Sequence, residues 1–236
     1  MLNKLIVFLG SRLLDAEAGI ANATLPRFAG PAPGLMIRTP REIGNPHLIH
    51  FGRDVKIGPN SVIKATTRFP GGWLKHPAGE HVSQTFTPTI SFGDRVTATS
   101  ALQVVAFDSI TIGDDVMFAG NIYVSDGQHG TGRGDLAYKF QGIEGVAPIS
   151  IGRGAWIGQN VVVLPGSTIG EFAVIGANSV VRGDIPARSM VVGAPARVVR
   201  VWDDTSAAWR KPADGTEHAA TQNGKEPAIA VNREGA

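Results

Sequence analysis

Branched aliphatic residues recur at every sixth position in the C-terminal half of the chain. The uninterrupted run consists of Ile151, Ile157, Val163, Ile169, Ile175 and Val181. The same spacing occurs upstream in Phe51, Ile57 and Ile63, in Phe92, Ala98 and Val104, and in Ile112, Phe118 and Val124. A helix cannot use this period, because six residues advance it about 1.7 turns and scatter the apolar positions around its axis. Short strands joined by tight corners can use it, so the pattern predicts an all-β solenoid.

The residues around each repeat aliphatic fit a strand that ends in a sharp turn. Residues two apart lie on one face of a strand. The residue two before each aliphatic is small or β-branched, as in Ala155, Val161, Ser167, Ala173 and Ser179. Glycine often follows the aliphatic and permits a corner that a Cβ would obstruct. We therefore expect large and small side chains to alternate inside each coil, and Trp156 to point outward.

The sixfold spacing fails in two places, over residues 64–89 and 125–148. A solenoid tolerates insertions at its corners, because each coil contacts only its neighbours. Long loops rich in glycine and polar residues are more often functional than structural. The expected organisation is a lead-in over residues 1–48 with a short helix at Leu2–Leu14, a solenoid over residues 49–202, and a polar, poorly ordered tail over residues 203–236. A local helix is expected in that tail near Ala207–Arg210.

Composition narrows the range of functions. Lysine and arginine number 22 and aspartate and glutamate 20 among 236 residues, so the net charge of +2 gives no electrostatic reason to expect nucleic acid or an anionic membrane as partner. Cysteine is absent, which excludes a disulfide scaffold, a cysteine zinc site and an acyl-cysteine intermediate. No apolar run approaches the roughly 18 residues of a transmembrane helix. We expect a cytoplasmic protein without a signal peptide.

Two stretches carry a family resemblance. The units Ile157-Gly158-Gln159-Asn160-Val161-Val162 and Ile175-Gly176-Ala177-Asn178-Ser179-Val180 resemble the hexapeptide repeats of the left-handed β-helix acyltransferases. The segment Gly193-Ala194-Pro195-Ala196-Arg197, with Arg200 three residues on, resembles the Gly-x-Pro-x-Arg ending of the sugar O-acetyltransferases in that superfamily. The resemblance implies a left-handed parallel β-helix of triangular coils, usually assembled as a homotrimer.

His129 is the candidate catalytic residue. It lies in Val124-Ser125-Asp126-Gly127-Gln128-His129-Gly130, where the second interruption begins. A similar segment in the family, often Asp-His-Asn-His-Gly, supplies the catalytic base at its last histidine; here Gly127 replaces the earlier histidine. The resemblance implies that His129 deprotonates the acceptor and that Asp126 contributes to acceptor binding. Imidazole suits proton transfer near neutral pH, and the alternative interpretation is a solvated loop histidine.

The resemblance also implies acetyl-CoA as acyl donor and a set of residues that bind it. These are Trp156, the amides of Gly158 and Ala177, and the side chains of Arg182, Arg197 and Arg200. Backbone amides can stabilise the oxyanion of an attacked thioester, and guanidinium groups pair well with phosphates. Other interpretations stay open, because Trp156 could pack at a subunit interface, the glycine could be purely steric and the arginines could be ordinary surface residues.

The function that these features predict is transfer of an acetyl group from acetyl-CoA to a sugar hydroxyl in polysaccharide or glycan biosynthesis, by direct attack in a ternary complex. The alternatives are an N-acetyltransferase of an amino sugar or sugar nucleotide, a metal enzyme like the γ-class carbonic anhydrases, and a non-catalytic scaffold. The histidines at positions 47, 50, 76 and 81 lack the closely spaced pair on successive coils that the metal enzyme needs, so no metal is expected. The first interruption, around Trp73, is expected either to bind the acceptor, with Trp73 stacked on the sugar ring, or to form a contact within a trimer.

Overall fold

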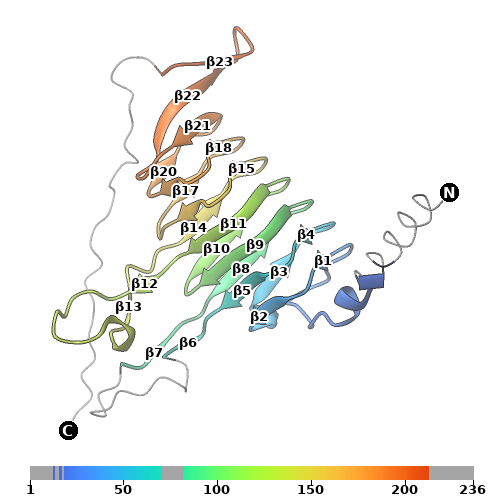
Figure 1. Ribbon diagram of the computed structural model, residues 1–236, viewed down its shortest axis with the longest axis vertical. Coiled ribbons are helices and arrows are strands. Elements are labelled where there is room, and N and C mark those ends of the chain that lie inside the picture. The colour runs from blue at the N-terminus through green and yellow to red at the C-terminus, as the bar shows by residue number, and fades with distance from the viewer. Residues whose placement is uncertain (1–12, 14–15, 18, 71–81, 213–236) are drawn as a thin grey trace.

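Short parallel strands stack coil upon coil into a long triangular prism (Figure 1). The computed structural model describes residues 13, 16–17, 19–70 and 82–212. Each coil contributes one strand to each of three faces. The first face contains β3 (Ile49–Phe51), β8 (Thr89–Phe92), β10 (Ser109–Ile112), β14 (Ile149–Ile151), β17 (Thr168–Ile169) and β20 (Asp184–Ile185).

The other two faces are joined into one sheet because two long strands, β9 (Thr97–Ala106) and β11 (Met117–Ser125), bend around the corner between them. The second face contains the first halves of these strands with β1 (Met36–Ile37), β4 (Lys56–Ile57), β15 (Trp156–Ile157), β18 (Val174–Ile175) and β21 (Ser189–Val192). The third face contains their second halves with β2 (Arg41–Gly44), β5 (Ser61–Ala65), β16 (Val162–Val163) and β19 (Val180–Val181).

The core is the column of inward side chains that the sixfold spacing predicts. The six aliphatics of the C-terminal run are no more than 1 % exposed, and the five small or β-branched residues two positions before them are fully buried. Buried serines at the corners donate to the carbonyl three residues earlier, as Ser167 does to Leu164 at 2.7 Å. Trp156 points outward and is 48 % exposed. The predicted alternation of large and small inward residues is confirmed.

The solenoid begins earlier than residue 49. β1 pairs in parallel with β4, and β2 pairs in parallel with β5, so the first coil already starts at Met36. Ile37 and Ile43 extend the sixfold spacing from Ile49 toward the N-terminus. The surrounding prolines and glycines make this spacing hard to recognise in the sequence. The 3-10 helix η1 (Pro46–Leu48) forms part of the turn into β3. Most of the predicted helix at Leu2–Leu14 lies outside the described residues, and residues 19–23 are helical.

An antiparallel hairpin closes the C-terminal end of the prism. β22 (Arg197–Asp203) pairs with β21, and β23 (Ala208–Arg210) pairs with β22. The predicted helix near Ala207–Arg210 is therefore wrong, because the hairpin supplies backbone partners and an edge-to-face contact between Trp202 and Trp209, with ring centroids 5.4 Å apart. The rest of the expected tail, beyond residue 212, lies outside the described residues. Among those described, no helix has the length and apolar character needed to cross a membrane.

The corner between the second and third faces carries a ladder of asparagine side chains, and we call it the asparagine corner. Asn121, Asn160 and Asn178 all adopt a left-handed backbone conformation, with φ of 60°, 59° and 59°. Asparagine tolerates this conformation better than most residues. The Asn121 amide donates to Asn160 Oδ1 at 2.9 Å, and the Asn160 amide donates to Asn178 Oδ1 at 3.0 Å. The ladder therefore ties three successive coils together at their tightest turn.

Replacement of Asn160 by alanine should lower the free energy of unfolding by about 1–2 kcal/mol. The substitution removes two side-chain hydrogen bonds, and alanine tolerates a positive φ less well than asparagine does. Chemical denaturation of the two proteins measures the difference. Gln159→Ala, at the exposed neighbouring position, is the matched control. Equal stability of the Asn160 and Gln159 variants would show that the ladder does not stabilise the corner.

Candidate functional site

Two arms project from the same corner of the prism, between the third and first faces (Figure 1). We call it the arm corner. The first arm, described over residues 66–70 and 82–88, contains the antiparallel strands β6 (Arg68–Phe69) and β7 (Gln84–Thr85). The second arm, residues 126–148, contains the antiparallel strands β12 (Gln128–His129) and β13 (Ile143–Glu144), and the 3-10 helix η2 (Tyr138–Phe140). These arms account for the two predicted interruptions, although Lys64, Ala65, Thr89 and Ser125 still belong to coil strands.

A glutamine side chain of the first arm bonds to the backbone of the second arm. The Gln84 amide group of the first arm donates to the Ile143 carbonyl at 3.0 Å, and its Oε1 accepts from the Ile143 amide at 2.7 Å. Gln84 thus acts like an added strand residue along β13. Ile143 is the β-sheet partner of His129, so this contact fixes the strand against which His129 is paired. No periodic signal in the sequence marks Gln84, and it was not predicted.

His129 lies on β12 with its imidazole exposed, facing the first arm. Its ring makes an edge-on contact with the Phe69 ring, with centroids 5.3 Å apart. Within the described part of the chain, neither imidazole nitrogen has a hydrogen-bond partner. An exposed imidazole held by a neighbouring ring and a paired backbone can exchange a proton with a bound molecule. The catalytic role of His129 stays a prediction.

Asp126 has a structural position at the base of the second arm. Its carboxylate is fully buried and accepts from the Phe107 amide at 2.7 Å and from the Asp108 amide at 2.9 Å. Burial raises the pKa of this carboxyl group, while the two backbone donors oppose that rise. Both oxygens are thus bonded to the coil that lies between the two arms. The acceptor contact predicted for Asp126 is replaced by anchoring of the second arm to the prism.

The predicted donor-binding amides differ in their availability. The Gly158 amide donates to the Ile175 carbonyl at 2.8 Å within the coil stack, so it is not free for a ligand. A Cβ at Gly158 would lie 2.6 Å from the same oxygen, which explains the glycine by close approach of the next coil. Ala177 is exposed at the asparagine corner, and its amide has no acceptor among the described residues. Of the two predicted amides, only that of Ala177 has no acceptor among the described residues, and its part in donor binding stays a prediction.

The other candidates for donor binding lie at two separate places. Trp156 is on the second face between Met117 and Val174 of the adjacent coils. Arg197 and Arg200 are on β22, which pairs with β21 of that face, whereas Arg182 is exposed at the arm corner. None of the three arginines forms an ion pair within the described residues, although the Arg197 guanidinium donates one hydrogen bond to the Ala196 carbonyl at 3.0 Å.

The geometry of the triangle separates the two groups of candidates. His129 and Arg182 belong to the arm corner, and the face opposite that corner is the second face, which carries Trp156. Within one chain the body of the prism therefore lies between the imidazole and the indole. Trp73, His76 and His81 lie outside the described residues. Among the residues that the structure describes, no group of three or more histidine, aspartate or glutamate side chains could hold a metal ion.

Replacement of Gln84 by alanine should loosen the second arm, because both hydrogen bonds to Ile143 are lost. Hydrogen–deuterium exchange should become faster in peptides that cover residues 128–145 and stay unchanged in peptides from β14 to β18. Gln128→Ala, at an exposed glutamine of the same arm, is the control and should leave exchange unaltered. Unchanged protection of the Ile143 region in the Gln84 variant would show that the arms are held by other contacts.

Sequence comparisons agree with the architecture. Residues 148–183 match the family described as bacterial transferase hexapeptide (six repeats). The chain is 33 % identical over 129 residues to a putative lipopolysaccharide biosynthesis O-acetyl transferase of Escherichia coli (strain K12), a match that covers 52 % of this chain and 65 % of that protein. It is 35 % identical over 136 residues to the galactoside O-acetyltransferase of the same organism, covering 56 % of this chain and 62 % of that protein. The matches thus span less than two thirds of either relative.

A solved structure shares the fold at low sequence identity. AntD, an N-acyltransferase from Bacillus cereus crystallised with dTDP and 3-hydroxybutyryl-CoA, superposes with a TM-score of 0.57 at 14 % identity, covering 76 % of this chain and 86 % of that chain. The sixfold repeats, the triangular coils and the sequence matches lead to one conclusion. The chain carries hexapeptide repeats like those of bacterial transferases, has the β-helix fold of the solved N-acyltransferase, and is similar in sequence to sugar O-acetyltransferases.

Proposed function

We propose that this chain is a cytoplasmic CoA-dependent acyltransferase that moves an acetyl group from acetyl-CoA to a sugar hydroxyl in polysaccharide or glycan biosynthesis. The observation that carries the proposal is the exposed imidazole of His129, held on an arm that Asp126 and Gln84 anchor. Relatives that are named as O-acetyltransferases of lipopolysaccharide biosynthesis and of galactosides supply the substrate class. Neutral imidazole at such a site would act as a general base.

The proposed reaction needs one base and no covalent enzyme intermediate. His129 accepts the proton of the acceptor hydroxyl while the oxygen attacks the thioester carbonyl carbon. The carbon–sulfur bond then breaks, and the CoA thiolate takes the proton back from the imidazolium, which leaves an acetyl ester and CoA thiol. A backbone amide near the carbonyl oxygen would stabilise the developing oxyanion, and the exposed Ala177 amide is the candidate for this contact.

A complete site of this kind would form between two copies of the chain. His129 lies at the arm corner, whereas Trp156, Ala177 and Arg197 lie at or beyond the second face. Lateral packing of two prisms would bring the arm corner of one copy to the second face of another, and we propose the homotrimer of the family as that assembly. Arg197 and Arg200 would then pair with the CoA phosphates, with Arg182 as an added cation beside the arms.

The outward side chains of the prism fit lateral association. In the C-terminal half of the second face, Met117 and Trp156 are exposed by 45 % and 48 %, and Val174 and Met190 continue this apolar row, whereas the coils before it place Thr97 and Lys56 in the same register. The first face presents a polar row instead, which runs through His50, Ser91, Thr111, Ser150, Thr168 and Asp184. An apolar row on one face and a polar row on another favour burial of the former and hydration of the latter.

Replacement of His129 by alanine should reduce turnover by about 100- to 10,000-fold, the usual contribution of a general base. The assay follows CoA thiol release from acetyl-CoA with methyl galactoside as the hydroxyl acceptor and with glucosamine as an acceptor that also has an amine. Transfer to methyl galactoside is expected for the wild type. His50→Ala, an exposed histidine on the first face, is the control with unchanged turnover.

An unaltered rate in the His129 variant, with the oligomer intact by light scattering, would remove this imidazole from the mechanism. Transfer to glucosamine but not to methyl galactoside would show that the acceptor group is an amine and not a hydroxyl.

A further inference from the structure

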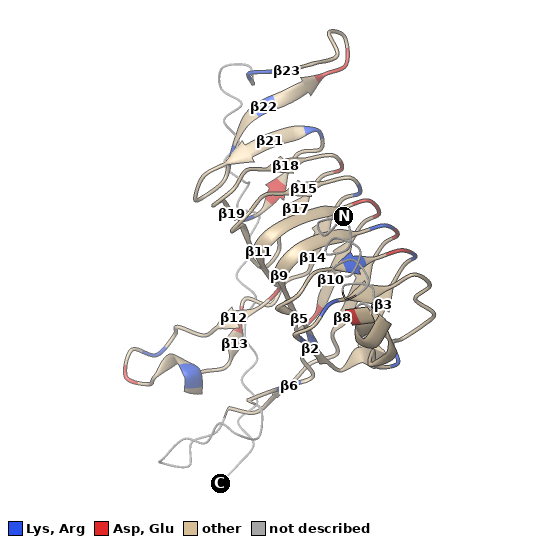
Figure 2. Cartoon of the chain, turned by 45° about the vertical axis from the view of Figure 1, so that its right-hand side comes forward, with Lys and Arg blue, Asp and Glu red and all other residues tan. Residues whose placement is uncertain are grey.

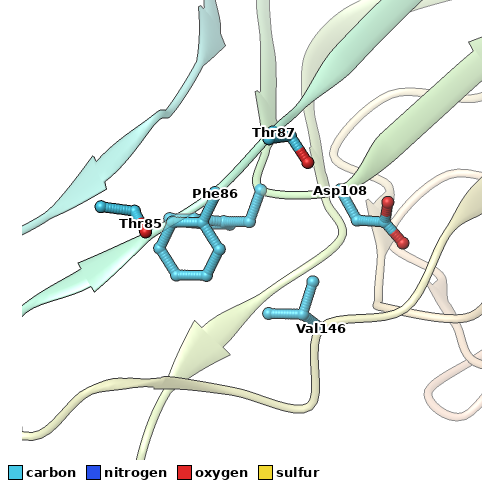
Figure 3. A pocket seen from close by; sticks show the side chains of 6 residues that line it. Thr85, Phe86, Thr87, Asp108 and Val146 are labelled. Atoms are coloured by element: carbon cyan, nitrogen blue, oxygen red, sulfur yellow. The ribbon is translucent and has the colours of Figure 1, made fainter.

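A cleft of about 320 Å³ opens where the two arms meet the prism. Figure 3 shows its walls, which come from the first arm, from the coil corner between the arms and from the end of the second arm. The lining residues are Thr85, Phe86, Thr87, Phe107, Asp108 and Val146. None of them belongs to the sixfold pattern, and the proposed chemistry of His129 does not use them.

The walls of the cleft divide into an apolar and a polar side. The Phe86 ring packs edge-on against the Phe107 ring, with centroids 5.1 Å apart, and Val146 lies beside them. The Thr87 hydroxyl and the Asp108 carboxylate form the other side (Figure 3). The Asp108 amide is bonded to Asp126, but its carboxylate has no partner among the described residues. A free carboxylate beside an open aromatic face is a binding surface with one apolar and one hydrogen-bonding half.

This division matches the surface of a pyranose ring. A sugar ring presents C–H groups on its faces and hydroxyl groups around its edge. The C–H face suits the quadrupole of an aromatic ring, and a carboxylate accepts short, strong hydrogen bonds from hydroxyl groups. A charged peptide or a nucleobase would use the polar wall less fully, because the cleft offers a single carboxylate and no cation among its lining residues.

The cleft also lies close to His129 along both arms. Phe86 comes two residues after Gln84, which bonds to Ile143, the strand partner of His129. On the second arm, a Cβ at Gly127 would lie 2.7 Å from the Phe107 ring, and Gly127 comes two residues before His129. Two residues of extended chain span about 7 Å. A ring held in the cleft would therefore reach toward the imidazole.

The geometry points to this cleft as the subsite that holds a pyranose ring of the acceptor, with Phe86 as the stacking surface and Asp108 as the hydroxyl acceptor. The inference rests on the proposed function for the identity of the acceptor, but sugar binding itself requires neither acetyl-CoA nor turnover. Sugar binding and acetyl transfer can therefore be measured separately.

Saturation-transfer NMR on the full chain, without CoA, tests the subsite directly. The probes are methyl β-D-galactopyranoside and methyl β-D-glucopyranoside. Ring protons of at least one probe should receive saturation from the wild type. Phe86→Leu keeps an apolar side chain against Phe107 but removes the aromatic face, and Asp108→Asn removes the charge; each should raise the dissociation constant about 3- to 10-fold, consistent with the strength of such contacts.

The controls are Phe172→Leu and Asp184→Asn, an exposed aromatic and an exposed carboxylate away from the arms, and they should bind as the wild type does. Absence of saturation transfer to both probes, or binding that survives in both cleft variants, overturns the subsite. Sugar binding that depends on the cleft in a protein that never transfers acetyl groups would instead overturn the proposed function and leave the subsite in place.

Discussion

Stacking of inward aliphatic side chains along one axis is the interaction on which the rest of this chain depends. Each coil places a large and a small residue over those of the coil below, and the backbone bonds of every strand run along the same axis. A fully buried isoleucine or valine contributes about 1.5–3 kcal/mol relative to exposure, so the repeated column supplies the stability that the turns lack. Because each coil contacts only its neighbours, an insertion at a corner disturbs no distant contact.

The three corners of the prism have three different chemistries. The asparagine corner is joined by neutral side-chain hydrogen bonds. The corner between the first and second faces carries alternating charges, seen in Figure 2 at the edge of the stack, where Arg95 pairs with Asp115 at 2.7 Å and Arg153 with Glu171 at 3.0 Å. These pairs are half exposed, so each contributes little to stability. Among the described residues, the arm corner has no ladder of either kind, and it is where both insertions leave the coils.

Hydrogen bonds attach the second arm to the prism and to the first arm. Two backbone amides of the intervening coil bind the Asp126 carboxylate, and Gln84 joins the arms further out. The buried Asp126 carboxylate fixes the start of the second arm, and the Gln84 side chain bonds to it further out. Together they restrict the position of His129 while its imidazole stays exposed. An exposed imidazole on a fixed support is the arrangement that the proposed proton transfer from a bound hydroxyl requires.

The features that could be predicted from the sequence are those that repeat. The aliphatic period fixes which residues face inward, and from it the outward position of Trp156 follows. The start of the solenoid at Met36 was missed, because one coil without the glycine signature gives too few repeats to recognise. The β22–β23 hairpin was missed for a similar reason, since its short strands are stabilised by pairing and by the contact of two tryptophans rather than by local propensity.

The site was less predictable than the fold because its contacts join distant segments. Nothing near Gln84 indicates that it would bond to Ile143, and the burial of Asp126 depends on two amides of another coil. The engagement of the Gly158 amide follows from the close approach of the next coil, which the sequence implies only through the glycine. His129 was found by resemblance of its neighbours to a family motif, and the structure adds the arm that carries it.

The central claim is that the imidazole and the donor-binding residues meet only between copies of the chain. Co-expression of His129→Ala and Arg197→Glu chains with different tags, followed by assay of purified mixed trimers at low acetyl-CoA, tests it most directly. Each variant alone should be nearly inactive. In the proposed homotrimer, each purified mixed trimer should regain about one third of the wild-type sites, because one of its three interfaces combines an intact imidazole with an intact arginine from the neighbouring copy. Mixed trimers no more active than the parents would contradict the account, since they would place both groups in a site within one chain.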